Sequence, residues 1–453
     1  MARLTGARGP QTRENDMTET HEPERTATPR HDMRLESWHT VTGIAAISFA
    51  ATFAQIPADT WASTAALSLA SGVSAAAMMG VAAALGSRWK WVESVFGGLD
   101  RVYLAHKWLA VWALAFASFH LVFEADADAW TTASMVTLPR PATRLVRQLS
   151  FVALMLIVLL ALNRNIPYQT WRWWHKLSGP LFVIVILHWL SIRSPIALGS
   201  AAGIWLATTA ALGIAGAAYK LLLYPFVSSH AEYRVTAVSS GGSALHLELA
   251  PVAKGVRFEP GQFAFLRFKV DGLREPHPFT IASGASPDAP VHFVIRPLGD
   301  YTQKLAREAQ VGMYADVYAP FGRFRRVDGA RREIWIAGGV GITPFLAWLT
   351  DESAAPMNGV TLFYCFTPGR EFPNPDLVRE LAERRGAEFV PISQGPRSQA
   401  FLERFAARVH EAGPTNIVVS HCGPKGLLAE VRTLMREQGI PEKNFKHEHF
   451  EFR

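Results

Sequence analysis

Hydrophobic residues are concentrated in the first half of the chain, where they form six long runs with few charges. Most of these runs approach the ~20 residues that an α-helix needs to cross the hydrocarbon core of a bilayer. The runs cover residues 38–56, 62–86, 101–123, 149–163, 170–192 and 197–224. The fourth run is shorter than the others, and we interpret all six as transmembrane helices.

The charged residues between these runs indicate how the helices are oriented, because arginine and lysine are enriched in cytoplasmic loops. Two loops are basic, with Arg88, Lys90 and Arg101 in the first and Arg164, Arg172 and Lys176 in the second. The opposite side carries Glu124, Asp126 and Asp128, and also the contrary residues Arg140, Arg144, Arg147 and Arg193. By majority the basic loops are cytosolic. This predicts a multi-pass protein of the plasma (inner) membrane with both termini in the cytosol.

From about residue 229 the pattern changes to short β-type runs that glycine and proline interrupt. The runs Leu245–Leu249, Phe263–Phe268 and Val291–Ile295 predict a small antiparallel β-barrel. After Arg331 strands alternate with helices, which predicts an α/β domain with an open parallel sheet. The fold class expected is therefore multidomain, with a six-helix transmembrane bundle, a β-barrel domain and an α/β domain. The expected divisions are a disordered cytosolic tail at 1–34, the membrane domain at 35–226, the barrel at 229–328 and the α/β domain at 331–453.

Composition narrows the function classes. The two cysteines, Cys365 and Cys422, are too few for a disulfide framework or for a plant-type iron–sulfur cluster, which needs four thiolates. The formal net charge is +7, but no basic helix or aromatic-interleaved basic patch accompanies it. We therefore expect the lipid bilayer and no nucleic acid as a partner, and we leave the oligomeric state open.

Four histidines lie inside the apolar runs, where ionisable residues are costly unless they are paired or bind a ligand. His106 and His120 lie in the third run, and His175 and His188 lie in the fifth. Both runs cross in the same direction, so the first histidines share one depth and the second histidines share another. A rise of ~1.5 Å per residue separates these depths by roughly 20 Å. That is too far for one metal site, but it suits two stacked porphyrins whose irons each take one imidazole on either face.

An isolated histidine in such a run more commonly hydrogen-bonds a backbone carbonyl, but four histidines at matched depths reverse that preference. The spacings are unequal, because a regular helix leaves His188 well off the face that carries His175. Gly179-Pro180 lies between them, and proline distorts a helix, so we expect a local distortion there. Arg172 and Lys176 flank the first pair, and two interpretations of them stay open. They pair with haem propionates, or they are basic residues of a cytoplasmic loop.

Two strings at hairpin distance, Glu259-Pro-Gly-Gln-Phe263 and Arg274-Glu-Pro-His-Pro-Phe-Thr-Ile-Ala-Ser283, resemble the flavin-binding signature of the ferredoxin-NADP reductase superfamily. The form HPFT is the variant of transmembrane NADPH oxidases and ferric reductases. The resemblance implies an FAD site in which Thr280 offers its hydroxyl, Pro278 fixes the strand, and His277 and Phe279 present flat groups. The stretch Ile295-Arg-Pro-Leu-Gly-Asp-Tyr-Thr302 is similar to the family's pyrophosphate-binding stretch. Its candidate residues are Ile295, Arg296 for its charge, Gly299 for close backbone approach, and Thr302 at a helix start.

The turn Ala337-Gly-Gly-Val-Gly-Ile-Thr-Pro344 is similar to the GGxGxTP turn of the same family's nicotinamide domain. Its candidate residues are Gly338, Gly339, Gly341, Thr343 and Pro344. Ser420-His-Cys-Gly-Pro-Lys425 resembles that domain's CGP element, which implies that Cys422 and Gly423 lie at the nicotinamide ring and that Cys422 and Thr343 are catalytic. Arg370 is a candidate for binding the 2′-phosphate of NADP, with NADPH or NADH left open. Family members often cover the flavin with a terminal aromatic residue, here Phe450 or Phe452.

Taken over residues 38–453, the resemblance implies a transmembrane flavocytochrome. Electrons from cytosolic NADPH or NADH would pass through FAD and two b-type haems, at His106/His175 and His120/His188, to an acceptor on the outer face. Oxygen, giving superoxide, and a ferric chelate are both compatible acceptors. Two alternatives stay open: an electron-transfer subunit that feeds a partner protein or quinone, and a metal transporter with a reductase-like regulatory module.

Overall fold

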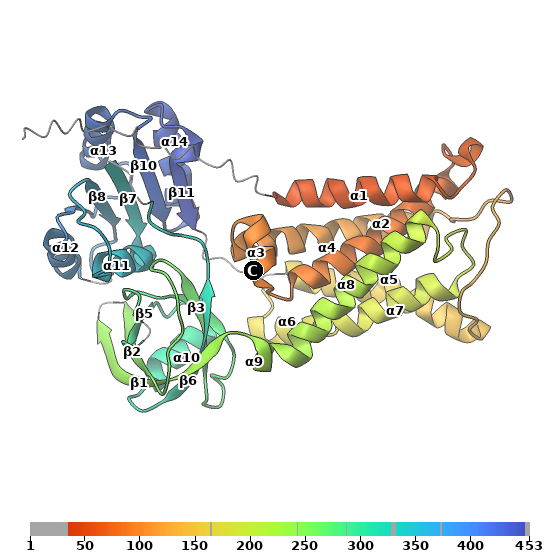
Figure 1. Cartoon of the computed structure of the whole chain (residues 1–453), viewed down its shortest axis with the longest axis horizontal. Helices are drawn as coiled ribbons and strands as arrows, with labels where there is room; N and C mark the ends of the chain where they lie inside the picture. The colour runs from red at the N-terminus through yellow and green to blue at the C-terminus, as the bar shows by residue number, and fades with distance from the viewer. Residues whose placement is uncertain are drawn as a thin grey trace, which may run out of the picture. The chain divides into compact units, whose positions relative to one another are not determined.

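A computed structural model describes residues 35–163, 165–241, 243–286, 288–327, 332–371 and 374–448, without the side chains of residues 168 and 169. The expected N-terminal tail, Arg164, Phe450 and Phe452 lie outside the described residues. Figure 1 labels the helices and strands in chain order.

The first half of the described chain is helical. Four of its helices are long and apolar enough to cross a membrane: α2 (Thr64–Leu85), α4 (Leu99–Val122), α5 (Arg140–Leu162) and the continuous segment Ala201–Val227. The last segment consists of α8 (Ala201–Ala218), a π-helical stretch (Tyr219–Leu223) and α9 (Tyr224–Val227). The remaining apolar helices are shorter, namely α1 (Ser37–Phe53) and α7 (Ser178–Ser191).

One predicted helix boundary was wrong, and one helix was not predicted. Helix α5 begins at Arg140 instead of residue 149, so Arg140, Arg144 and Arg147 lie on a helix and not in the outer loop. An apolar run ends where charge begins, whereas a helix can continue beyond the hydrocarbon with arginine, a good helix former. A short helix that the pattern did not indicate, α3 (Lys90–Phe96), follows α2 in the loop predicted to be cytosolic.

The fifth predicted helix is broken, as expected, but at a slightly different place. Helix α6 (Tyr168–His175) ends at His175, and α7 begins at Ser178 after the turn Lys176-Leu177. Pro180 therefore lies in the first turn of α7, where the amide group that proline lacks would have no partner within the helix.

The barrel domain consists of β1 (His230–Gly241), β2 (Ala244–Pro251), β3 (Phe263–Phe268), β4 (His277–Thr280), β5 (Val291–Ile295) and β6 (Tyr314–Phe321). The six strands pair in the order β4-β3-β6-β1-β2-β5, and the described ladders are antiparallel. A bridge between Ile281 and Phe293 joins the two ends of this order. The short helix α10 (Asp300–Glu308) lies between β5 and β6.

The last domain is a parallel sheet in the order β11-β10-β7-β8-β9. Its strands are β7 (Arg332–Gly338), β8 (Val360–Cys365), β9 (Glu388–Ile392), β10 (Ile417–Cys422) and β11 (Phe445–Glu448). Side chains alternate along each strand, so Trp335 packs with α11 (Thr343–Thr350) and α12 (Pro375–Arg384), while Ile336 packs with α13 (Gln399–Ala412) and α14 (Lys425–Glu437). The antiparallel barrel followed by a parallel sheet confirms the predicted order of the two domains.

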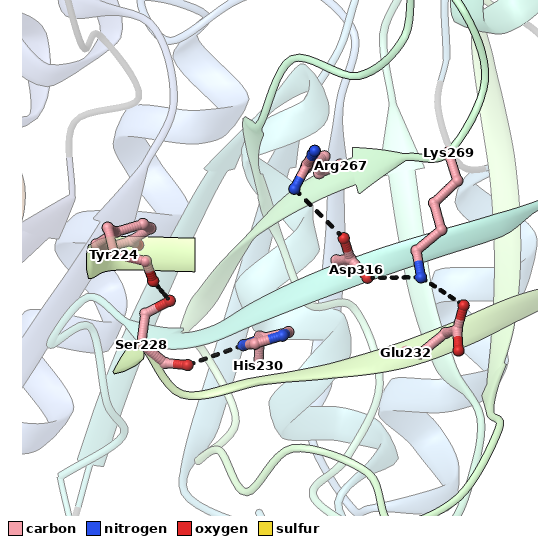
Figure 2. A network of polar contacts seen from close by, with 7 residues as sticks. All are labelled: Tyr224, Ser228, His230, Glu232, Arg267, Lys269 and Asp316. Carbon is pink, nitrogen blue, oxygen red and sulfur yellow. Dashed lines mark hydrogen bonds and ion pairs between the residues drawn. The ribbon is translucent and has the colours of Figure 1, made fainter. Parts of the chain in front are cut away.

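The last membrane helix is joined to the barrel by a short ordered connection. Figure 2 shows the hydroxyl of Ser228 donating to the carbonyl of Tyr224, and the Nδ1–H of His230 donating to the carbonyl of Ser228. Tyr318 of β6 stacks on both Tyr224 and His230. To the right of His230 in the view, Lys269 bridges Glu232 at 2.5 Å and Asp316 at 3.2 Å. The hydrogen bonds of Ser228 and His230 and the stacking of Tyr318 order the entry of the chain into β1.

Candidate functional site

The four histidines form two pairs. The imidazole ring centroids of His106 on α4 and His175 on α6 lie 5.9 Å apart, and those of His120 on α4 and His188 on α7 lie 6.4 Å apart. Within each pair the rings are close to perpendicular, at 73° and 85°. We call His106/His175 the inner pair and His120/His188 the outer pair.

Helix α2 orients the two histidines of α4. A carbonyl oxygen only accepts hydrogen bonds, so His106 donates from Nδ1 to the carbonyl of Ala82 at 2.7 Å, and His120 donates from Nδ1 to the carbonyl of Ser68 at 3.0 Å. Each ring therefore keeps its Nε2 as a free acceptor, which is the form that binds a metal. Gly72 makes room for one ring, since a Cβ there would lie 3.0 Å from Nδ1 of His120.

Two cations lie near the inner pair without a carboxylate partner in the described part of the chain. The guanidinium of Arg88 lies 3.7 Å from the ring centroid of Phe265, and its Nε donates to the hydroxyl of Tyr103 at 2.6 Å. The ammonium of Lys220, in the π-helical stretch, lies 3.5 Å from the ring centroid of Tyr224. Tyr103 is one helical turn from His106. No local sequence signal marks this cluster, because its members come from four separate segments.

The predicted flavin residues lie on β4, at one end of the barrel sheet. His277 stacks on Tyr301 with ring centroids 3.5 Å apart and planes 10° from parallel. Burial lowers the pKa of His277. The hydroxyl of Thr280 is buried and has no hydrogen-bond partner among the described residues, so it is available to a ligand. Pro278 and Phe279 pair with Phe265 and Ala264 of β3.

The predicted pyrophosphate stretch surrounds the start of α10. Ile295 ends β5, Arg296 is half-buried, and Gly299 is the residue before the first turn of the helix. The hydroxyl of Thr302 accepts hydrogen bonds from the amides of Leu298 and Gly299, both at 3.0 Å. The helix begins at Asp300, two residues before the predicted start. Open space surrounds Gly299, and the N-terminus of a helix next to such a glycine binds anions well.

The nicotinamide-type turn and the Cys-Gly-Pro element are in direct contact, although 80 residues separate them in the sequence. A Cβ on Gly341 would lie 2.2 Å from the carbonyl oxygen of Cys422, and Gly423 lies against the backbone of Gly338. Gly339 has a φ of +55°, which favours glycine. Thr343 starts α11 beside Pro344 and donates to the carbonyl of Val340 at 3.0 Å.

Cys422 is fully buried, and burial raises the pKa of its thiol well above the ordinary value. Cys365, which ends β8, is also buried, and its thiol pKa is raised to about 12. Arg370 lies exposed on the turn after β8.

Sequence reasoning missed Glu448, which aligns with Cys422 across the β10–β11 ladder. Its carboxyl is buried, and one oxygen has no hydrogen-bond partner in the described ranges. Burial, with added repulsion from Asp100 and Glu93, raises its pKa well above the ordinary value. Glu93 on α3 accepts the amide of Gly322 at 2.7 Å. The sequence signal was present, since Glu448 lies in the same short C-terminal string as the predicted flavin-covering aromatics.

Comparison with known proteins matches two parts of the chain to protein families. Residues 71–215 match the family described as ferric reductase like transmembrane component, and residues 231–318 match the FAD-binding domain family. A probable cell surface ferric reductase of Aspergillus oryzae is 25% identical over 303 residues, which cover 61% of this chain and 39% of the relative. The anthranilate 1,2-dioxygenase electron transfer component of Acinetobacter baylyi is 26% identical over 226 residues, covering 48% of this chain and 65% of the relative.

The chain thus spans less than two thirds of the length of these curated relatives. Among solved structures, the FAD/NAD-binding domain of a nitric oxide dioxygenase from Vibrio cholerae aligns with 48% of this chain and 97% of its own, at 20% identity and a TM-score of 0.42. A flavohemoglobin from Malassezia yamatoensis aligns with 86% of this chain and 98% of its own, at 16% identity and a TM-score of 0.47.

Proposed function

This chain is a ferric reductase homologue that joins a ferric reductase-like transmembrane domain to an FAD-binding domain of the ferredoxin-NADP reductase type, and on that premise we propose that it is a transmembrane flavocytochrome. Electrons from cytosolic NAD(P)H reach an acceptor on the outer face through FAD and two b-type haems. FAD supplies the necessary conversion, because nicotinamide delivers two electrons together and a haem accepts one at a time. The protein lies in the plasma membrane with both termini in the cytosol.

The observation that carries this proposal is the separation of the histidine rings within each pair. An imidazole nitrogen lies about 2.0 Å from a bound metal, and the ring centre lies about 1.2 Å further, so two imidazoles that would hold one metal between them should have centroids about 6.4 Å apart. The observed separations are 5.9 and 6.4 Å. In the described ranges, no group of three or more His, Cys, Asp or Glu side chains could hold a metal ion. Each pair offers only two histidine ligands, and a porphyrin iron needs only two ligands from the protein, so the pairs favour haem over a bare transported metal.

The surroundings of the inner pair support the same assignment. Arg88 and Lys220 are half-buried cations that face aromatic rings, and Arg172 lies one turn before His175. Half-buried cations need compensation, and the propionates of an inner haem would supply two negative charges. We assign Arg88 and Lys220 to these propionates, whereas Arg172 pairs with Glu275.

The soluble residues would bind the two other cofactors. Thr280 hydrogen-bonds the flavin with its free hydroxyl, and Arg296 with the start of α10 holds the pyrophosphate. Gly339 and Gly423 are the partly exposed glycines of the two turns, and the nicotinamide would rest against them. Cys422 and Thr343 are buried at these two turns, and burial raises the pKa of the Cys422 thiol.

An optical spectrum of the purified full-length protein tests the proposal. We expect Soret and α bands after dithionite reduction, and one FAD with two haems per chain by cofactor extraction. Bound zinc without these bands would favour the transport alternative. His188→Leu should preserve flavin reduction by NADPH and abolish delivery to the acceptor; unchanged delivery would contradict the assigned route.

An acceptor panel then identifies the final step. Superoxide formed from NADPH in air, and removed by superoxide dismutase, would establish an oxidase. Turnover with a ferric chelate, equal under argon and in air, would establish a ferric reductase. Some of the curated relatives are named electron transfer components, which supports a second candidate, an electron-feeding subunit for a partner protein or quinone. Activity of the isolated chain with small acceptors would exclude it.

A further inference from the structure

One ion pair joins the membrane helix of the inner pair to the predicted flavin strand. Nη1 of Arg172 on α6 lies 2.7 Å from Oε1 of Glu275, two residues before His277. The side chain of Glu275 is only 9% exposed, and that of Arg172 is 38% exposed. A carboxylate with so little water needs a cation, and Arg172 supplies it.

Each partner lies next to a residue of the proposed electron route. Arg172 precedes His175 by three positions, so the two side chains lie on adjacent turns of α6. Glu275 is held to His277 through its main chain, since Nδ1 of His277 donates to the carbonyl of Glu275 at 3.1 Å. His277 in turn stacks on Tyr301. A continuous series of contacts therefore runs from the inner pair to the flavin strand.

The ion pair adds to the contacts that orient helix α6. This helix has eight residues, and the turn at Lys176-Leu177 separates it from α7. The packing of α7 in the membrane therefore does not fix the axis of α6. An ion pair to the barrel gives α6 a reference point on the same domain that carries the flavin residues.

We propose that the Arg172–Glu275 ion pair is a positioning device that sets the distance between the flavin strand and the inner pair, and thereby the rate of electron transfer between them. This inference rests on the proposed function. Two electrons arrive together as hydride from NAD(P)H and leave singly. Each reduces one ferric iron to ferrous, and the proton returns to solvent. The pair affects only the transfers to the inner iron, because hydride delivery takes place at the GGVG turn.

The test uses the full-length, cofactor-loaded protein with Glu275→Gln, Arg172→Gln and the charge-swapped double variant Glu275→Arg/Arg172→Glu. Anaerobic stopped-flow absorbance follows flavin reduction by NADPH and, separately, the appearance of the reduced haem band. Electron transfer becomes slower as the distance between donor and acceptor grows. We expect the single variants to slow haem reduction severalfold while leaving flavin reduction unchanged, and the double variant to recover most of the loss.

Two further measurements separate positioning from simple damage. Glu232→Gln removes a partner of Lys269 in an exposed pair on the same barrel, and it should leave both rates unchanged. Hydrogen exchange of the α6 amides should be faster in the single variants and return to the unmodified rate in the double variant. The haem content of all three variants should be unaltered. Unchanged haem reduction in both single variants, or a loss that the charge swap does not restore, would overturn the proposal. Failure of the proposed function would show independently, as absence of haem bands in the unmodified protein.

Discussion

The contact between Gly341 and Cys422 gives the sharpest test of the nicotinamide site. In Gly341→Ala the new Cβ would lie 2.2 Å from the carbonyl oxygen of Cys422, 2.6 Å from its carbonyl carbon and 2.9 Å from the amide nitrogen of Gly423. Ordinary contact begins at 3.4 Å, and all three neighbours are backbone atoms that cannot rotate away. The two turns must therefore separate by about 1 Å, a displacement that can cost about 100-fold in rate at a reacting site.

The assay is anaerobic stopped-flow reduction of the flavin by NADPH. We expect Gly341→Ala to slow this step by about 100-fold while the dithionite-reduced haem spectrum stays unchanged. Gly426→Ala is the matched control, because no atom lies within 4 Å of its ideal Cβ on α14. That variant should stay within about twofold of the unmodified rate. A normal rate in Gly341→Ala, or an equal loss in Gly426→Ala, would refute the steric reasoning.

Three further predictions concern stability and reactivity. Gly213→Leu should lower the melting temperature in detergent, because its Cβ would lie 2.6 Å from a ring carbon of Phe182 and 2.8 Å from the Cα of Gly80; Gly43→Ala, with open space at its Cβ, should not. Burial raises the pKa of both cysteine thiols, so alkylation followed by mass spectrometry should label neither Cys365 nor Cys422 at pH 8 until the chain unfolds, and rapid native labelling would contradict this burial. The raised pKa of Glu448 means that the folded chain holds a proton that the unfolded chain loses above about 4.5, so stability should fall as the pH rises beyond that value. Glu448→Gln should flatten this fall in thermal melts, and an unchanged pH dependence would show that Glu448 does not titrate in this way.

Local pattern predicted the strands well and the ends of the helices less well. The strands at Phe263–Phe268 and Val291–Ile295 were predicted to the residue, because short runs of apolar and β-branched residues end abruptly at glycine and proline. Helix α5 extends nine residues before the apolar run that predicted it. Hydrophobicity reports where the bilayer lies, whereas the helix ends where its backbone hydrogen bonds end.

The residues of the candidate site could likewise be predicted only where a local sequence pattern marks them. Glycines at 338, 339 and 341 could be selected from the sequence because their spacing between a strand and a helix is itself the signal. The partners Arg172 and Glu275, or Glu93 and Gly322, carry no such signal. They come from segments far apart in the chain, and only the folded structure brings them together.

The unequal histidine spacings, which counted against two matched pairs, are consistent with the break between α6 and α7. At 3.6 residues per turn, the 14 residues from His106 to His120 return to within about 40° of the same face, but the 13 from His175 to His188 would leave the second ring about 140° away. The rings nevertheless pair at 5.9 and 6.4 Å. The chain is not one regular helix between these two rings, because the amide of Lys176 bonds to carbonyls two to four residues before it and a new helix starts at Ser178. A continuous helix through these positions would place His175 and His188 on different faces and could not offer both to the straight helix α4.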